Sequence, residues 1–259
     1  MTFRFRVGIL LALSALVTGV MLAIPRFEQD LDYHKFADDR CFLEIPNALN
    51  VVSNIPFVIV GVLGLCFLGS SAAKEPGRSF VNPSERWPYA FFFLFIALTG
   101  FGSAYYHWEP DNDRLLWDRL PLAIAFMAFF AIMISERISR RAGTILFWPL
   151  VLLGAGSVVY WHQSEVHQAG DLRIYLLVQF YPLLAIPLML WLFPAKYTRT
   201  ADLIGALVSY LAAKAFELLD RWVYAQGGLV SGHTLKHLLA AVTPYLIYHM
   251  IKYRRPIIR

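Results

Sequence analysis

The sequence has few charged residues. Only 16% of its 259 residues are Asp, Glu, Lys or Arg, 58% are hydrophobic, and the mean hydropathy is +0.53. Soluble globular domains have a hydrophobic share nearer ~45–50% and a charged share of about 25%. The shortage of charge therefore excludes an ordinary soluble domain and indicates a protein that crosses a membrane several times.

The sequence also has only two cysteines and lacks an internal repeat. Cys41 lies in a polar stretch and Cys66 lies within an apolar run, so the two do not indicate a structural disulfide or a metal motif. The lack of repeats argues against a transporter built from duplicated halves. No polar connection is long enough for a separate soluble domain, so we expect a single membrane domain over residues 1–259.

Eight apolar runs are present, each near the ~20 residues that a helix needs to cross a bilayer. They cover residues 7–25, 50–70, 88–107, 118–135, 144–161, 173–193, 201–219 and 232–251. The pattern predicts an all-α polytopic bundle. The first run is longer than the ~7–15-residue core of a signal peptide and lacks a small-residue cleavage site. We therefore expect it to remain as an N-terminal helix or signal anchor.

Lysine and arginine are unevenly distributed over the connections between these runs. With the N-terminus in the cytoplasm, fourteen lie in cytoplasmic segments and seven on the opposite side. Cytoplasmic segments are those in which these residues accumulate, so both termini are predicted to be cytoplasmic. This bias accounts for the net charge of +5, and we expect no nucleic-acid partner.

The segment 102–121 concentrates ionisable residues between two apolar runs. Such residues at the ends of membrane helices usually mark functional sites. The last run opens with His233 and His237, whose spacing of four places both imidazoles on one helix face. In the predicted topology His107, Asp118 and His233 lie at the outer membrane face, although they belong to three different helices. We interpret this layer as the active centre.

Three histidines with one open coordination position form a catalytic zinc site. His107, His233 and His237 are therefore predicted to bind one zinc ion; the alternative is three separate, hydrogen-bonded core histidines. Copper and iron also accept imidazole, but the lack of thiolates, nearby methionine and redox motifs favours zinc. Ser103 would donate to a developing oxyanion. Asp118 would take a proton from a water molecule at the zinc and pass it to the leaving group. A serine nucleophile is disfavoured because the metal occupies the histidines.

Three other polar groups have structural interpretations. The acidic loop over residues 30–44 is expected to be a solvated loop followed by an asparagine cap. The alternative is a lid over the outer cavity or a hard-cation site, since its oxygen ligands suit calcium, although the spacing differs from an EF-hand. His162 and His167 lack a third ligand and are expected to be exposed loop histidines. Lys214 and Glu217 are expected to pair within the bundle, with a proton relay as the alternative.

The motifs resemble those of the alkaline ceramidases, a family within the CREST superfamily of membrane hydrolases. The residues that carry the resemblance are Ser103-x3-His107, Asp118 eleven residues later, and His233-x3-His237. Three stretches are similar to the bacterial branch: Ile45-Pro46-Asn47 with Asn50-Val51-Val52-Ser53-Asn54, Trp117-Asp118-Arg119-Leu120-Pro121, and Ser231-Gly232-His233-Thr234-Leu235-Lys236-His237. The resemblance extends over residues 37–251.

The resemblance implies a seven-transmembrane-helix bundle, to which the run at 7–25 adds an N-terminal helix. It implies zinc held by His107, His233 and His237, with Ser103 as oxyanion donor and Asp118 as proton carrier. The implied reaction is hydrolysis of the ceramide amide to sphingoid base and fatty acid. Together with the orientation predicted from lysine and arginine, the resemblance to the bacterial branch predicts an integral protein of the lipid bilayer of a bacterial inner membrane, with the site towards the periplasm.

The acidic loop does not reproduce the calcium ligands of the eukaryotic ceramidases, so the resemblance does not extend to Ca2+. Two alternatives stay open for the function. One is an ester-cleaving lipid hydrolase of the same superfamily, because the same groups serve both reactions. The other is a receptor-like seven-helix protein in which the metal is structural. The sequence does not indicate the oligomeric state.

Overall fold

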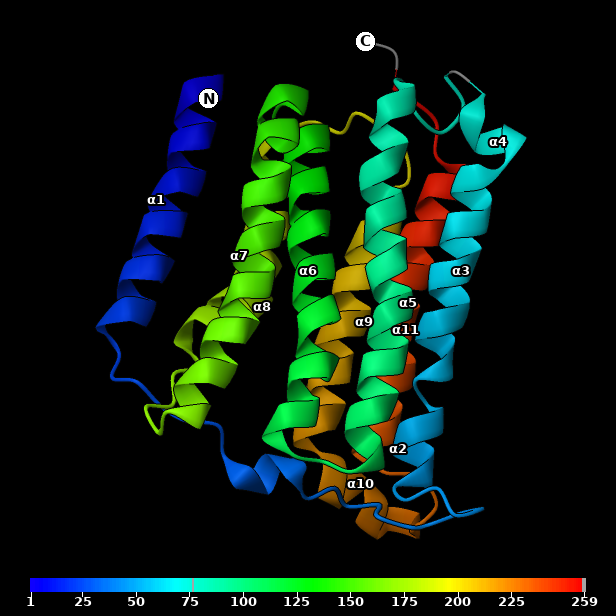
Figure 1. Cartoon of the computed structure of the whole chain (residues 1–259). Helices are drawn as coiled ribbons and strands as arrows, with labels where there is room; N and C mark the ends of the chain where they lie inside the picture. The colour runs from blue at the N-terminus through cyan, green and yellow to red at the C-terminus, as the bar shows by residue number, and fades with distance from the viewer. Residues whose placement is uncertain (76, 258–259) are drawn as a thin grey trace.

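The computed structural model describes residues 1–75 and 77–257, which form helices and connecting loops and contain no β-strand. Eight long helices run side by side in this part of the chain (Figure 1). They are α1 (Phe3–Ala23), α3 (Ile55–Gly69), α5 (Arg86–Trp108), α6 (Asn112–Arg137), α7 (Arg140–Val166), α8 (Arg173–Leu192), α9 (Thr200–Leu218) and α11 (Gly232–Tyr253). The short helices are η1 (Leu31–His34), α2 (Ala48–Val52), α4 (Ser71–Lys74), η2 (Pro83–Glu85) and α10 (Asp220–Gly227). The predicted all-α class is confirmed.

Six helical segments among the described residues are long and apolar enough to cross a membrane. They are Phe3–Ala23, Ala48–Gly69, Pro83–Trp108, Asn112–Arg137, Arg140–Val166 and Arg173–Leu192. Helices α9 and α11 correspond to the last two predicted runs but are more polar. Helix α9 contains Asp202, Lys214 and Glu217, and α11 begins with the two histidines of the predicted zinc site.

Helix α6 begins earlier than its apolar run. The run predicted a helix over 118–135, whereas the helix spans Asn112–Arg137. Asp111 caps it by accepting a hydrogen bond from the N–H of Arg114 at 2.6 Å. Hydropathy does not detect such a polar first turn. The predicted run placed Asp118 at the start of this helix. The structure places it nearly two turns inside the helix.

The predicted run over 50–70 is divided into α2 and α3. Pro56 occupies the first turn of α3, where its missing N–H removes no helical hydrogen bond. The predicted asparagine cap is wrong, because neither Asn47 before α2 nor Asn54 before α3 makes a side-chain cap hydrogen bond. Asn47 instead has a left-handed backbone with φ 48°, and its amide bonds to another helix.

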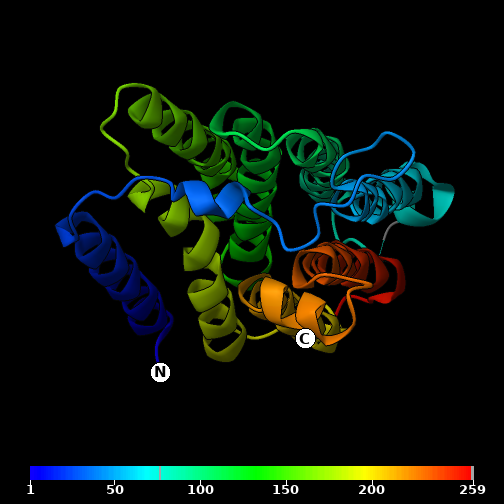
Figure 2. The same cartoon turned by 90° about the horizontal axis from the view of Figure 1, so that it is seen from below.

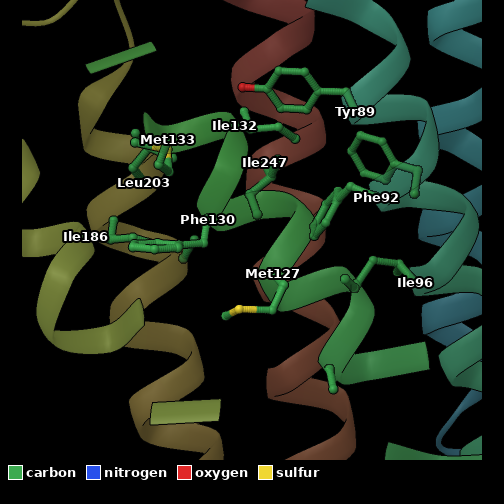
Figure 3. Packing of buried hydrophobic residues seen from close by; sticks show 14 of the residues in the cluster. Tyr89, Phe92, Ile96, Met127, Phe130, Ile132, Met133, Ile186, Leu203 and Ile247 are labelled. Atoms are coloured by element: carbon green, nitrogen blue, oxygen red, sulfur yellow. The ribbon is translucent and has the colours of Figure 1, made fainter. Parts of the chain in front are cut away.

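A buried apolar cluster joins α5, α6, α8, α9 and α11 in the middle of the bundle (Figure 3). Its labelled members are Tyr89, Phe92, Ile96, Met127, Phe130, Ile132, Met133, Ile186, Leu203 and Ile247. Interiors packed in this way resist relative movement of their elements. This core therefore fixes the ends of α5, α6 and α11 relative to one another.

The backbones of α5 and α6 approach closely beside the predicted site. A Cβ atom added to Gly102 would lie 2.0 Å from the carbonyl oxygen of Trp117. Only glycine permits this approach, because it has no side chain. Gly102 precedes Ser103 and Trp117 precedes Asp118, so the contact brings the two predicted catalytic residues towards one another.

The start of α1 and the end of α11 lie at the same end of the bundle (Figure 1). Helices α2 and α10 lie at the opposite end, where the loop after α1 crosses the bundle (Figures 1 and 2). Helix α1 stands at the periphery beside α8. Cys41 and Cys66 are free and exposed, in agreement with the expected absence of a disulfide between them.

Candidate metal centre

Three buried histidines converge at the end of the bundle opposite the start of α1. His107 lies in the last turn of α5, and His233 and His237 lie in the first turns of α11. Their ring centroids are 4.7–4.9 Å apart in all three pairs, and at most 4% of each residue is exposed. One nitrogen from each lies within 4.8 Å of the other two. The structure thus brings together the three predicted ligands, as a group that could hold a metal ion.

The spacing of the nitrogens fits a tetrahedral ion. Nε2 of His107 and Nε2 of His233 are 3.3 Å apart. Two imidazole ligands at 2.0–2.1 Å from one zinc ion are about 3.3 Å apart when the coordination is tetrahedral. Nε2 of His237 is fully buried and has no hydrogen-bond partner among the described residues. A buried imidazole nitrogen normally has a partner, and a metal ion would supply one.

Ser53 determines which nitrogen of His237 is free. The Ser53 hydroxyl donates to the carbonyl oxygen of Asn50 at 3.1 Å, so its oxygen accepts from Nδ1–H of His237 at 2.8 Å. This arrangement leaves the lone pair of Nε2 directed away from Ser53 and available for a ligand bond. Ligand histidines are typically oriented by such a hydrogen bond at the other ring nitrogen.

The loop after α1 is bonded to the histidine helices. Asp220, at the start of α10, accepts hydrogen bonds from the backbone N–H of His233 at 2.7 Å and of Ala37 at 2.9 Å. The ring of Phe36 lies 4.7 Å from that of His107 and 4.6 Å from that of His233. The loop therefore covers the metal centre, as expected of a lid.

The predicted solvated loop is wrong at Asp38, although residues 39–44 are exposed as predicted. Asp38 is 2% exposed, and its carbonyl oxygen accepts a hydrogen bond from the side chain of Asn50, which is fully buried. The Asp38 carboxylate pairs with Arg40 at 2.7 Å, and hydrogen bonds from Arg40 lower the pKa of Asp38. Asp32 pairs with Lys35 instead. These acids point to separate basic partners and not to one common cation.

The other two predicted site residues line one cavity with His237. The cavity has a volume of about 310 Å³ and is lined by Ser103 and Asp118 as well as by His237. The Ser103 hydroxyl and the Asp118 carboxylate form no hydrogen bond or ion pair with another described side chain. Apolar residues from α5, α6, α8, α9 and α11 form most of the remaining wall, including Phe92, Ile96, Phe129, Ile186, Leu203 and Ile247.

Sequence reasoning did not assign Lys236 to the site. Its ammonium lies 2.7 Å from the carboxylate of Glu217 and 3.3 Å from Nε2 of His233. Lys214 pairs with the same carboxylate, which confirms the predicted pair, and the Tyr33 hydroxyl donates to it at 3.3 Å. The sequence could have indicated Lys236 as a site residue, because it is a charged residue between two histidines in an apolar run. Glu217 therefore pairs with both ammonium groups beside the histidines.

The remaining predicted histidines are not at the metal centre. Helix α7 extends to Val166, so His162 is helical and not in a loop as predicted. Its Nε2 lies 2.8 Å from Asp113, and His167 bonds through Nδ1 to the carbonyl oxygen of Gln163 at 2.7 Å. Both therefore have local partners at another part of the bundle.

Comparisons with protein families, with curated proteins and with solved structures find no match to this chain.

Proposed function

We propose that this protein is a zinc-dependent intramembrane lipid amide hydrolase that resembles the alkaline ceramidases and cleaves a ceramide-like lipid to an amine and a fatty acid. One observation carries the proposal. Three buried histidines have ligand spacing, and one of them, His237, lines a largely apolar cavity. The wall of this cavity also contains the Ser103 hydroxyl and the Asp118 carboxylate, neither of which has a side-chain partner among the described residues. A cavity of this size and lining suits the apolar part of a lipid.

Zinc is favoured because all three ligands are imidazoles and one coordination position is left for water or substrate. When bound, zinc polarises a carbonyl group and lowers the pKa of a water molecule to about 7, which supplies a nucleophile at neutral pH. Ser103 donates a hydrogen bond to the amide oxygen as that oxygen gains negative charge. Asp118 accepts a proton from the attacking water and delivers it to the leaving nitrogen.

The same groups would also cleave an ester, because only the leaving atom differs. A receptor-like protein with a structural metal would keep the three histidines but would release no product. Purified protein in lipid nanodiscs, incubated with a ceramide, a diacylglycerol and a sterol ester, distinguishes these functions by mass spectrometry of the products. We expect the amide to be cleaved, the reaction to stop after chelation and to return with Zn2+.

The ligand set is tested by metal analysis of single variants. His107→Ala, His233→Ala and His237→Ala should each lose stoichiometric zinc, because two imidazoles are fewer than the three protein ligands of a catalytic site. His162→Ala is the matched control and should keep it. Full zinc content in His107→Ala would refute the shared site. Product release that continues after complete zinc removal would refute a catalytic role for the metal.

A further inference from the structure

Arg119 is a buried cation that the proposed hydrolysis does not use. It is 5% exposed and lines the same cavity as Ser103 and Asp118. Its Nη2 donates to the side-chain oxygen of Gln29 at 2.6 Å, whereas Nη1 is buried without a hydrogen-bond partner among the described residues. No described carboxylate lies within ion-pair distance of it. Because a buried charge without a counter-charge is costly, this arrangement indicates a missing anionic partner.

Aromatic rings cover the faces of the guanidinium group. Its central carbon lies 4.2 Å from the ring centroid of Trp161, 4.6 Å from that of Tyr175 and 5.5 Å from that of Tyr33. These contacts stabilise the cation and hold its plane in one orientation. The N–H groups at Nη1 are therefore free to donate to an acceptor that lies in the plane of the guanidinium group. A carboxylate is planar and matches the N–H groups of a guanidinium edge.

The charge balance of the cavity also favours an anion. Its lining contains three cations, Arg119, Lys214 and Lys236, but only two carboxylates, Asp118 and Glu217. Glu217 is shared by the two lysines, and neither carboxylate pairs with Arg119. One positive charge is therefore left over among the side chains that line the cavity. A single carboxylate balances Arg119 with less excess charge than a phosphate monoester, which carries about −1.5 to −2 at neutral pH.

We propose that Arg119 binds a carboxylate of the lipid ligand. The proposal rests on the proposed function only in taking a lipid as the occupant of this cavity. The carboxylate has two sources: an acidic headgroup attached to the amide nitrogen of the substrate, or the fatty acid that hydrolysis releases. In both cases the guanidinium edge holds the acid, and the apolar wall holds the acyl chain.

The test compares acids with neutral analogues in the full-length protein in nanodiscs. The first pair is N-palmitoylglycine and its methyl ester, and the second pair is palmitate and methyl palmitate. Binding is measured by calorimetry without added zinc, so that it does not depend on turnover. We expect at least one acid to bind more tightly than its ester by about tenfold or more, the range for a charge-assisted hydrogen bond. Equal affinities in both pairs for the wild type would overturn the proposal without any variant.

Arg119→Met should remove this preference, because methionine keeps much of the side-chain volume without the charge. Arg137→Met is the matched control: Arg137 is also a buried arginine of α6, bonded to Thr200, but lies about 27 Å further along the helix and outside the cavity. We expect it to leave the preference unchanged. A preference that survives in Arg119→Met would overturn the proposal. If that variant does not fold, Arg119→Lys tests the same point, since an ammonium lacks the planar edge.

The two pairs and the hydrolysis assay separate the possible failures. Arg119-dependent preference for N-palmitoylglycine assigns the carboxylate to the substrate headgroup, and a preference for palmitate alone assigns it to the product. Ceramide hydrolysis without any Arg119-dependent acid binding would refute this inference and leave the proposed function standing. Arg119-dependent acid binding without hydrolysis of any lipid would refute the proposed function and leave this inference standing.

Discussion

The hydrogen bond between Ser53 and His237 orients an imidazole that we propose as a metal ligand. Ser53→Ala removes the acceptor for Nδ1–H, so the imidazole can rotate or change tautomer. Loss of such a partner typically lowers metal affinity about 10–100-fold. We expect a loss of this size for zinc, measured by competition with a chromogenic chelator.

The matched control for Ser53 is Ser157→Ala. Ser157 is also buried, but its hydroxyl donates to the carbonyl oxygen of Gly154 within α7, away from the histidines. It should leave zinc affinity unchanged. Unchanged affinity in Ser53→Ala would show that His237 is oriented by other contacts.

Asp118 and Ser103 should be separable by their effects on turnover. Neither is a proposed metal ligand, so Asp118→Asn and Ser103→Ala should both keep zinc. Loss of a general acid–base residue typically costs ~10²–10⁴-fold in rate, and loss of one oxyanion donor ~10²–10³-fold. Asp118→Asn should also change the pH profile of hydrolysis, whereas Ser103→Ala should lower the rate at every pH. The measurement is ceramide hydrolysis across a pH series together with zinc content.

Two results would change these assignments. Loss of zinc in Asp118→Asn would make this carboxylate a ligand or an essential partner of one. A covalent acyl intermediate in the wild type that disappears in Ser103→Ala would make the serine a nucleophile.

The sequence was sufficient to predict which histidines come together at the site, but it was not sufficient to predict the contacts of the residues around them. The spacing of His233 and His237 follows directly from helical geometry, and the order of the helices placed His107 at the same end. The role of Ser53 depends on a contact between residues 184 positions apart, which no local pattern records. The absence of a carboxylate partner for Arg119 among the described residues could not be inferred either, because it depends on how all the helices pack together.

At the scale of elements, the close approach of α5 and α6 is the contact that positions the cavity wall. Gly102→Ala would place a methyl group against the carbonyl oxygen of Trp117 and force the helices apart. Overpacking of this kind typically lowers the free energy of unfolding by about 1–3 kcal/mol. A displacement of about 1 Å between Ser103 and Asp118 would lower turnover by about 10²-fold. Thermal unfolding in micelles and hydrolysis rates measure the two effects.

The control for this glycine is Gly156→Ala in α7. A Cβ atom at Gly156 meets no other atom within 4 Å. Alanine there should stabilise the helix by about 0.5–1 kcal/mol and leave turnover unchanged, because glycine has the larger unfolded entropy. Equal stability of the two variants would show that the α5–α6 contact can relax at no cost.

The connection between α7 and α8 contains a pH-sensitive attachment of α1. Arg173 donates to Asp171 at 2.8 Å and to the carbonyl oxygens of Leu22 at 3.1 Å and Ile24 at 2.8 Å. Hydrogen bonds from Arg173 lower the pKa of Asp171 to about 2. The unfolded value is near ~3.9, so the stabilisation is complete above pH 4 and is lost as the pH falls towards 2.

We expect this loss to be on the order of 2 kcal/mol in the free energy of unfolding, since one pKa unit corresponds to about 1.4 kcal/mol. Unfolding temperatures between pH 6 and pH 2 measure it. Asp171→Asn should be less stable at pH 6 and should lack this contribution to the acid-induced decrease. The same decrease in the variant as in the wild type would assign the acid sensitivity to other groups.

The helices themselves could be predicted from the apolar runs, although their ends could not. Hydropathy marks the apolar part of a helix, so the polar first turn of α6 and the last turns of α7 were missed. The short helix α10 was also missed, because it is amphipathic and polar. This helix matters for the site, because Asp220 in its first turn accepts hydrogen bonds from the covering loop and from the backbone of His233.

At the scale of the whole molecule, the three histidines of the candidate metal centre lie at one end of the bundle. His107 is at the end of α5 and His233 at the start of α11, whereas the start of α1 and the end of α11 are together at the other end (Figure 1). If the bundle spans a bilayer, one orientation therefore decides the compartment of the site. The distribution of lysine and arginine favours the chain ends in the cytoplasm and the site on the opposite face.

Reporter fusions test this orientation. A fusion after residue 142, in the first turn of α7, lies at the end of the bundle that we expect to be cytoplasmic. A fusion after residue 259 follows the end of α11, which lies at the same end of the bundle. A fusion after residue 112, at the start of α6, lies at the metal-centre end. We expect a cytoplasmic reporter to be active in the first two fusions and a periplasmic reporter to be active only in the third. The reason is that the segments on the side of the third fusion contain only seven basic residues, too few to keep these segments in the cytoplasm. The reverse pattern would place the metal centre at the inner leaflet, and the lipid substrate would then have to be supplied from the cytoplasmic side.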